Sequence, residues 1–355
     1  MTSPDKVIRP DVLAIHAYPV AADTAGMVKL DAMENPYRLP PELREAVARA
    51  VAGAELNRYP DPAAPSLKAR LRAVYAIPAG CEILIGNGSD EIIAITTCAI
   101  ARPGAVVLAP EPSFVMYKMS AGFAGARFVG VPLAADFSLD LGRFLAAIET
   151  HRPALVWLAY PNNPTGNAFA ASDIERIIAA APGLVVIDEA YHVFARRSFM
   201  ARLPEFPNLM VMRTVSKEGL AGIRLGYAAA APAWIAELDK VRPPYNVNVI
   251  TQVVAETLLE HHAVLEDQAR RILADRAALL AELRQIERVA VFASEANFLL
   301  VRVPDAPRTY AAMKARRVLV RNFHGSHALL ANCLRITVGA PEENARMIAA
   351  LTESI

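Results

Sequence analysis

The sequence predicts an open, mostly parallel α/β sheet followed by a smaller α+β unit. From about residue 65, helical patterns alternate with short apolar runs, which read EILIG, AVVLA, RFVGV, ALVWLA, LVVID, LMVMRT and RLGYAAA. These runs are rich in Val, Ile and Leu and hardly alternate with polar residues, which is typical of strands that helices cover on both faces. Helical stretches of crossover length, such as SDIERIIAAA, separate several of them.

The pattern changes after VRPPYNVN, where residues 249–286 predict two long, charged helices. Strands at NFLLVRV, VLVRNF and CLRITVG follow, beside two more helices. A chain of 355 residues is long enough for two domains, because single cores stop growing at roughly 250–300 residues. We therefore predict an N-terminal arm with part of the small domain (1–45), a large domain (46–244) and a small C-terminal domain (245–355).

Composition argues against several classes of protein. The 37 basic and 36 acidic residues are spread without blocks, so no field that gathers nucleic acid or anionic membrane is expected. The opening MTSPDKVIRPDV lacks the order of a secretory signal, and the apolar runs are too short to span a bilayer, so we expect a cytoplasmic protein without membrane segments. Cys81, Cys98 and Cys333 are scattered, so they are expected to be buried apolar residues, and no metal site is indicated.

Polar loops follow the predicted strands, at the sheet edge where open parallel sheets bind ligands. GNGSDE follows EILI, and its glycines permit close backbone approach. Ser89 and Asp90 then begin a helix, where free N–H groups and the helix dipole favour an anion. PNNPTG follows ALVWLAY and offers the amide of Asn163. Each loop alone is equally compatible with an ordinary capped or proline turn.

Two further strand ends add charged groups. DEAYHVF places Asp188 at the end of a buried strand, close to Tyr191, and a buried carboxylate needs a cationic or hydrogen-bonding partner. Ser216 and Lys217 follow LMVMRT, with Arg224 beyond them. A desolvated lysine near other cations loses proton affinity, and its neutral amine can form a Schiff base. Pyridoxal 5′-phosphate (PLP) uses all these groups, through its aldehyde, its ring nitrogen and its phosphate.

The ordered motifs GNGSDE, PNNPTG, DEAY, VSK and GIRLGY resemble those of the PLP-dependent aminotransferases of fold type I, and within them the histidinol-phosphate aminotransferases. The resemblance covers nearly the whole chain, from IRPDVLAIHAYP through NRYPDP to CLRITVG. It implies the PLP-dependent transferase fold and reversible amino transfer between L-histidinol phosphate and 2-oxoglutarate. The products would be imidazole-acetol phosphate and L-glutamate, within histidine biosynthesis.

By this resemblance, Lys217 is the Schiff-base lysine and Asp188 is the partner of the pyridine nitrogen. Asn163 and Tyr191 would donate hydrogen bonds to the phenolic oxygen of the ring, and Tyr191 joins Lys217 and Asp188 as a predicted catalytic residue. Phe114 stands where most relatives have a ring-stacking tyrosine. The residues that would hold the phosphate are Ser89, Asp90, Ser216 and Arg224.

The resemblance also assigns substrate and partner contacts. Tyr59 in NRYPDP would reach the cofactor phosphate of a neighbouring subunit, which implies a homodimer with shared active sites. Arg335 in CLRITVG matches the arginine that grips a substrate carboxylate through a bidentate fork. Arg321, with Tyr18 and Tyr59, resembles the subsite for the substrate phosphate or for the distal carboxylate of glutamate, and Asn163 completes the substrate set.

Three alternatives stay open at this point. An aromatic amino acid aminotransferase would share the chemistry, because a phenyl ring and an imidazole fit similar pockets. A threonine-phosphate decarboxylase of the same fold would differ in how it holds the scissile carboxylate. A non-catalytic PLP-sensing module is disfavoured, because such regulators carry an N-terminal DNA-binding helix pair and the chain shows no basic segment ahead of its motifs.

Overall fold

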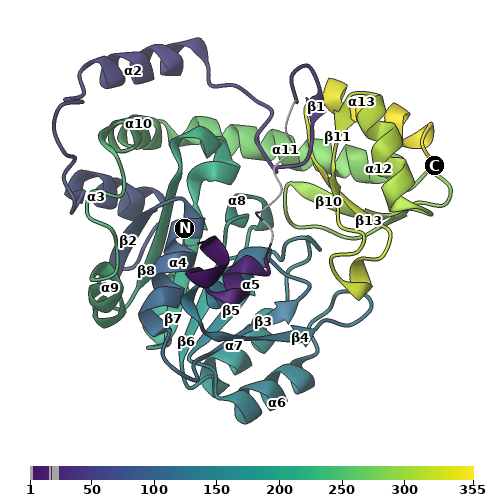
Figure 1. The fold of residues 1–355 in the computed structure, drawn as a ribbon. Coiled ribbons are helices and arrows are strands. Elements are labelled where there is room, and N and C mark those ends of the chain that lie inside the picture. Colours follow the sequence, from purple (N-terminus) through teal and green to yellow (C-terminus); the bar gives the residue numbers. More distant parts are fainter. Residues whose placement is uncertain (1–2, 16, 18–23) are drawn as a thin grey trace.

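The computed structural model describes residues 3–15, 17 and 24–355 and consists of a large and a small lobe (Figure 1). A seven-stranded sheet in the order β2-β8-β7-β6-β5-β3-β4 forms the large lobe. The central pairs are parallel, and only β8 runs antiparallel to its neighbours β2 and β7. The predicted apolar runs form these strands, with bounds β2 Glu82–Asn87, β3 Val106–Glu111, β4 Arg127–Pro132, β5 Leu155–Ala159, β6 Leu184–Asp188, β7 Leu209–Thr214 and β8 Leu225–Ala230.

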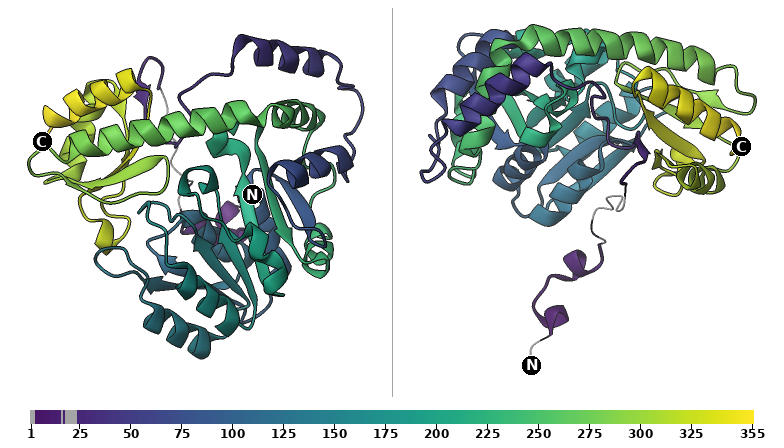
Figure 2. Two further views of the ribbon diagram at one scale, coloured as in Figure 1. Left: turned by 180° about the vertical axis from the view of Figure 1, so that it is seen from behind. Right: turned by 90° about the horizontal axis from the view of Figure 1, so that it is seen from above.

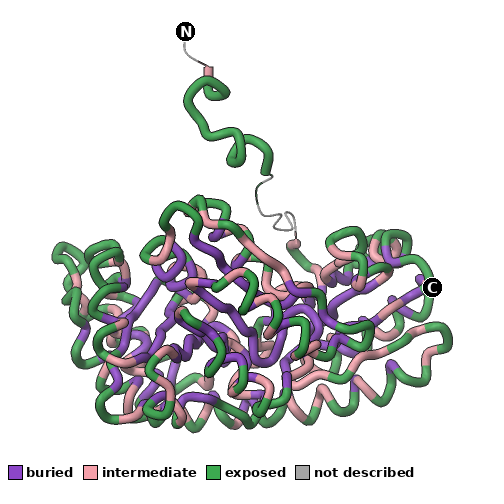
Figure 3. The backbone as a smooth tube through the Cα atoms, turned by 90° about the horizontal axis from the view of Figure 1, so that it is seen from below, coloured by how far each residue is buried: buried purple, intermediate pink, exposed green. Residues whose placement is uncertain are grey.

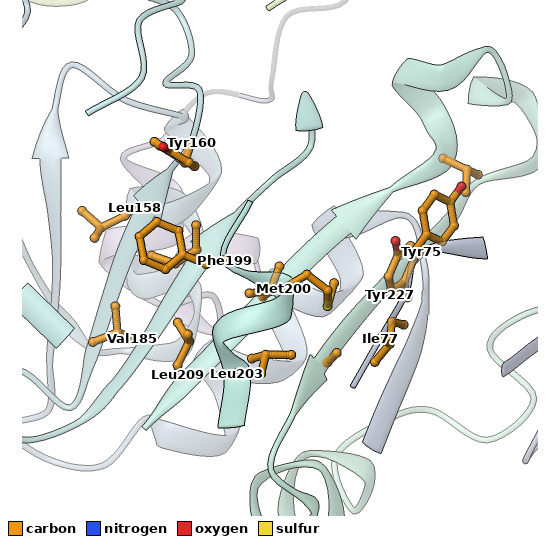
Figure 4. Packing of buried hydrophobic residues seen from close by; sticks show 14 of the residues in the cluster. Tyr75, Ile77, Leu158, Tyr160, Val185, Phe199, Met200, Leu203, Leu209 and Tyr227 are labelled. Atoms are coloured by element: carbon orange, nitrogen blue, oxygen red, sulfur yellow. The ribbon is translucent and has the colours of Figure 1, made fainter. Parts of the chain in front are cut away.

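Helices cover both faces of this sheet, as the non-alternating strands predict. Along β5, Val156 and Leu158 pack into one buried cluster, whereas Leu155 and Trp157 pack into the cluster on the other face. The first cluster also contains Tyr75 and Tyr227, whose stacked rings are visible in Figure 4. The helices of the large lobe are α2 Pro41–Ala52, α3 Pro65–Val74, α4 Ser89–Ile100, α5 Val115–Ala124, α6 Leu141–His151, α7 Ala171–Ala180, α8 His192–Ala195, α9 Pro232–Asp239 and α10 Val249–Glu260.

A long helix, α11 (His262–Leu283), connects the two lobes (Figure 1). Leu265 near its start belongs to the core of the large lobe, whereas Leu279 and Leu283 near its end belong to the core of the small lobe. The small lobe contains a four-stranded sheet in the order β12-β13-β10-β9. Its elements are β9 Ala290–Val291, β10 Phe298–Arg302, α12 Ala306–Ala315, β11 Val318–Leu319, β12 Arg321–Asn322, β13 Cys333–Thr337 and α13 Pro341–Thr352.

The N-terminal segment belongs partly to the small lobe and partly to an exposed arm. Its strand β1 (Val28–Lys29) pairs in parallel with β11. Ahead of it, η1 (Pro4–Lys6) and α1 (Pro10–Leu13) are exposed on nearly all sides (Figures 2 and 3). Arg9 attaches this arm to the end of α5 by donating hydrogen bonds to the carbonyl oxygens of residues 122 and 123.

The domain boundaries 1–45, 46–244 and 245–355 stay a prediction, and α10 packs with the core of the large lobe through Val254 and Leu258. Within the described residues, no helix is long and apolar enough to cross a membrane. Cys81 and Cys333 are buried, but the prediction of burial is wrong for Cys98, which is exposed near the end of α4. The remaining short helices are η2 Met200–Glu205, η3 Val215–Glu218, η4 Ala221–Ile223 and η5 Ala328–Leu330.

Candidate active site

The predicted cofactor-binding residues, apart from Tyr59, line one cavity of about 540 Å³. It lies at the carboxyl ends of β5, β6 and β7, where each strand passes into a polar loop. The predicted residues that line it are Ser89, Asp90, Phe114, Asn163, Asp188, Tyr191, Ser216, Lys217 and Arg224. The lining also includes residues that the sequence did not single out: Met33, Ala159, Pro161, Ala190 and Thr214.

One wall of this cavity is built to receive an anion. Helix α4 begins at Ser89, and its N-cap, Gly88, has no side chain to accept the first free N–H groups. Gly88 has φ of +81°, and an added Cβ would lie 2.6 Å from Nη2 of Arg224. Arg224 Nη2 lies 3.4 Å from Asp90 Oδ2. The close approach, the free N–H groups and the guanidinium together make a site suited to a phosphate.

Asp188 occupies the floor of the cavity at the end of β6 and is only 5% exposed. Tyr117 Oη donates a hydrogen bond of 2.6 Å to Oδ2, and the N–H of Ala190 donates one of 3.0 Å to Oδ1. Burial raises the pKa of the Asp188 carboxyl to about 6, although the two hydrogen bonds act in the opposite direction. A cationic ring nitrogen placed against this carboxylate would offset its burial.

Tyr117, the residue that orients Asp188, is not among the predicted site residues. Tyr117 lies on α5 and is buried, with its ring stacked on Trp157 at a centroid distance of 4.9 Å. It also meets Phe114 edge-to-face at 5.7 Å. Its position three residues after Phe114, the N-cap of α5, was the signal available in the sequence.

Lys217 enters the cavity from η3, the single turn that follows β7. Burial, and secondarily the charge of Arg335, lowers the pKa of the Lys217 amine to about 8. Its Nζ donates a hydrogen bond of 3.0 Å to the carbonyl oxygen of Ala32. A buried amine that loses its proton near neutral pH is suited to bond covalently with an aldehyde.

A second cavity of about 900 Å³ adjoins the first and contains Arg321, Arg335 and Asn163 in its lining. Arg335 Nη1 donates a hydrogen bond of 2.5 Å to Asn163 Oδ1, and Nη2 donates one of 2.8 Å to the carbonyl oxygen of Asp31. Asn163 and Phe114 line both cavities. The structure therefore places two predicted substrate arginines next to the predicted cofactor residues.

Tyr59 does not line either of these cavities. Tyr59 is 79% exposed and stacks on Tyr245 at a centroid distance of 4.4 Å. Tyr18 lies outside the described residues. Within the part of the chain that the structure describes, no group of three His, Cys, Asp or Glu side chains could hold a metal ion.

Known proteins are similar to this chain in both sequence and fold. A sequence profile of the family described as aminotransferase class I and II matches residues 25–351. Histidinol-phosphate aminotransferase 2 of Cupriavidus pinatubonensis is 57% identical over 356 residues, which cover 99% of this chain and 97% of that relative. Histidinol-phosphate aminotransferase of Chromobacterium violaceum is 57% identical over 346 residues, which cover 98% of this chain and 97% of the relative.

A solved structure agrees with these relatives. The crystal structure of histidinol-phosphate aminotransferase from Sinorhizobium meliloti in complex with pyridoxal-5′-phosphate matches with a TM-score of 0.87 and 26% identity, covering 98% of this chain and 97% of that chain. These matches define the class of protein as an aminotransferase of class I and II. The chain belongs to the family of histidinol-phosphate aminotransferases. The predicted family, fold class and enzyme class are thereby confirmed.

Proposed function

We propose that this protein transfers an amino group reversibly between L-histidinol phosphate and 2-oxoglutarate, with PLP as its cofactor, in L-histidine biosynthesis. One observation carries the proposal: a buried lysine, a buried carboxylate and an anion site share a single cavity, and two arginines line the adjoining one. Relatives named histidinol-phosphate aminotransferase match over nearly the whole chain, and the solved structure of one such enzyme contains PLP. The predicted cytoplasmic location stays a prediction.

The donor set of the cavity fits PLP. Lys217 supplies the amine for the aldehyde, and Asp188 supplies the anion for the ring nitrogen. Asn163 and Tyr191 supply donors for the phenolic oxygen, while Phe114 supplies a ring face for stacking. The start of α4, with Ser89 and the backbone N–H of Asp90, would hold the phosphate together with Ser216 and Arg224.

Bound PLP supplies an electron sink that stabilises negative charge at the substrate Cα. Asp188 holds the proton on the ring nitrogen, because its buried carboxylate gains most from an adjacent cation. Lys217 Nζ would take the proton from the substrate Cα and deliver it to the carbon that was the aldehyde carbon of the cofactor, and its lowered pKa leaves much of the amine neutral near pH 8. Tyr117 keeps the carboxylate of Asp188 in place through its hydrogen bond.

Contacts with neighbouring side chains fix the guanidinium of Arg335 in a position suited to bind an anionic substrate group. Its guanidinium lies between the rings of Phe298 and Phe323, each at 5.3 Å, and its side chain is 5% exposed. Such a restrained fork loses little freedom when it binds a carboxylate of glutamate. Arg321 lines the same cavity and would take the phosphate of histidinol phosphate or the distal carboxylate of glutamate.

Arg321→Ala is expected to separate phosphorylated from aromatic substrates. A phosphate carries more charge and more acceptor oxygens than a carboxylate, so its binding depends more on this guanidinium. We expect kcat/KM for histidinol phosphate to fall by roughly 2–4 kcal/mol in apparent ΔΔG‡, with a smaller effect on glutamate and the smallest on phenylalanine. Steady-state kinetics with the three amino donors measure this order.

Arg308→Ala, at an exposed position on α12, is the matched control and should leave all three donors unchanged. Unchanged kinetics with histidinol phosphate in Arg321→Ala would refute the assigned subsite.

The alternative functions are tested with the unmodified protein. We expect glutamate to react fastest with imidazole-acetol phosphate in a panel of keto acids. Faster turnover of phenylalanine than of histidinol phosphate would favour an aromatic aminotransferase and leave the cofactor chemistry intact. Release of CO₂ from threonine phosphate would instead favour a decarboxylase.

We further propose that the protein is a homodimer with shared active sites. The described surface carries large apolar side chains that are exposed in the single chain, many of them on the arm and near Tyr59. They include Val7, Ile8, Val12, Leu13, Ile15, Leu56, Tyr59, Tyr245 and Ile250. A second copy of the chain would cover these side chains and receive Tyr59 at its phosphate site.

Mixed dimers test this arrangement. If Tyr59 serves the partner, a dimer of one Lys217→Ala chain and one Tyr59→Ala chain has one site with both lesions and one with neither. After random exchange of the two inactive variants, activity should return to about one quarter of the unmodified value.

Mixing Lys217→Ala with Asp188→Asn provides the control, because both of these residues line one cavity of the same chain. Every site of that mixture keeps a lesion, so no activity should return. Absence of recovery in the Tyr59 mixture after demonstrated exchange would show that Tyr59 acts within its own chain.

A further inference from the structure

A buried carboxylate lies directly beside the lysine of the active site. Glu218 ends the η3 turn that carries Lys217 and is only 2% exposed. Tyr75 Oη donates a hydrogen bond of 2.8 Å to its Oε2, and His262 Nε2 lies 3.0 Å from the same oxygen. Tyr75 follows α3 and His262 begins α11, so three segments that are distant in sequence meet at this carboxylate.

The geometry favours a charged imidazole at His262. Its Nε2 faces Glu218, and its Nδ1 lies 3.5 Å from Oε1 of Glu266, so both ring nitrogens face carboxylates. Burial lowers the pKa of His262, but the hydrogen bond and charge of Glu218, with the charge of Glu266, outweigh it and raise the pKa above its usual value. Glu218 therefore stabilises the protonated form of the partly buried His262.

Two other groups near Glu218, His192 and Arg213, are not its cationic partner. His192 Nε2 lies 3.6 Å from Glu218 Oε1, but burial and Arg213 hold the pKa of His192 well below its usual value. Its Nδ1 lies 3.1 Å from the carbonyl oxygen of Glu189, which can only accept. Neutral His192 therefore carries its proton on Nδ1 and presents no donor to Glu218. Arg213 faces the Tyr75 ring, but its guanidinium pairs with Glu189 at 2.7 Å.

The backbone beside Lys217 is fixed as well. Asn35 Nδ2 donates to the carbonyl oxygen of Glu218 at 3.0 Å and to Gln268 Oε1 at 2.9 Å. Gly219 follows with φ of +125°, and a Cβ there would lie 2.8 Å from Asn35 Nδ2. Because Gln268 lies on α11, the turn is tied to this helix through both its backbone and the Glu218 side chain.

We propose that the buried Glu218 and the partly buried His262 form an ion pair that holds Lys217 in the active-site cavity and that both act as positioning residues for amino transfer. The inference rests on the proposed role of Lys217. Breaking a buried pair on one side leaves an uncompensated charge, which the chain relieves by loosening the turn. Lys217 then gains access to water, and the pKa of its amine returns toward its usual value of 10.5.

Competitive acetylation of the full-length, cofactor-free protein measures this effect directly, because it gives the titration of Lys217 without any turnover. In Glu218→Gln and in His262→Gln, Lys217 labelling at pH 8 should fall by up to about fivefold as its pKa rises by up to about one unit. In the PLP-loaded enzyme, kcat should fall about tenfold while KM for glutamate changes less than about twofold.

Two further variants sharpen the test. Glu282→Gln removes an exposed carboxylate near the C-terminal end of α11, away from His262, so it should change neither the titration of Lys217 nor kcat. The double variant Glu218→Gln/His262→Gln leaves no unpaired buried charge. Its loss of kcat should therefore be smaller than the product of the two single losses.

Several results would overturn the proposal. A lower Tm with an unchanged Lys217 titration would reduce the pair to a structural role, and losses that multiply in the double variant would show that the two residues are independent. If Glu218→Gln does not fold, His262→Gln and Tyr75→Phe decide the question by the same titration. Borohydride trapping of PLP on a lysine other than Lys217 would instead refute the proposed function, so the two failures are distinguishable.

Discussion

Lys217→Ala is expected to abolish amino transfer while leaving PLP bound non-covalently. The variant removes the amine that we propose to move the substrate proton but keeps the start of α4 and Arg224. Proton transfer by a positioned side chain contributes roughly 10²- to 10⁴-fold, so kcat should fall by at least this range. Absorbance and equilibrium dialysis would show retained PLP, and single-turnover assays with glutamate would show the lost reaction.

Borohydride reduction of the unmodified enzyme should mark Lys217 alone in peptide maps. Lys118→Ala, which removes a lysine that is 63% exposed on α5, is the control and should keep both labelling and turnover. A label on another lysine, or substantial turnover in Lys217→Ala, would refute the assignment of Lys217 as the catalytic amine.

The sequence predicts the large sheet well because its strands are buried on both faces. A run such as LVVID has no polar side to place in water, so its composition alone indicates covered strands. Parallel strands bring their carboxyl ends to one edge, which is why Asp188 and Lys217 could be expected near each other from strand ends alone. Their convergence in one cavity agrees with this expectation.

The remaining features depend on packing that the order of residues does not reveal. Tyr117 reaches Asp188 only because α5 lies across the sheet with this face inward. The sequence alone gives no sign that Glu218, next to Lys217, is buried. Its burial depends on two distant segments, which place Tyr75 and His262 against its carboxylate. Tyr59 is exposed in the single chain, and in the proposed homodimer its surroundings would be set by another chain.

Asp188→Asn should have the second-largest effect on catalysis. Asparagine keeps the shape of the side chain, and the Tyr117 hydroxyl can rotate to accept from its amide, but the negative charge opposite the ring nitrogen is lost. The nitrogen then holds its proton less well, and we expect kcat/KM to fall by several kcal/mol in apparent ΔΔG‡, as when a buried ion pair is broken on one side. Near-normal turnover would contradict the assigned partner of the ring.

The same substitution should stabilise the cofactor-free protein at neutral pH. Burial raises the Asp188 pKa from 3.8 to about 6, so between these values the folded state binds more protons than the unfolded state. The free energy of unfolding of the cofactor-free protein therefore falls as pH rises through this window. Above pH 6 the ionised Asp188 carboxylate lowers the stability of the folded state by roughly 3 kcal/mol. Asp188→Asn removes the charge and should gain up to about this amount at pH 8.

Urea unfolding of the cofactor-free proteins at pH 8 and at pH 4 measures the difference. The advantage of Asp188→Asn should shrink at pH 4, where the folded wild-type protein already carries the proton on Asp188. Asp5→Asn, at an exposed position of the arm, should show no comparable change. A cofactor-free Asp188→Asn protein that is less stable at pH 8 would mean that local hydrogen bonds outweigh the burial of this charge. If the variant is instead more stable, the Asp188 carboxylate that weakens the cofactor-free fold is the same group that a cationic ring nitrogen of PLP would stabilise.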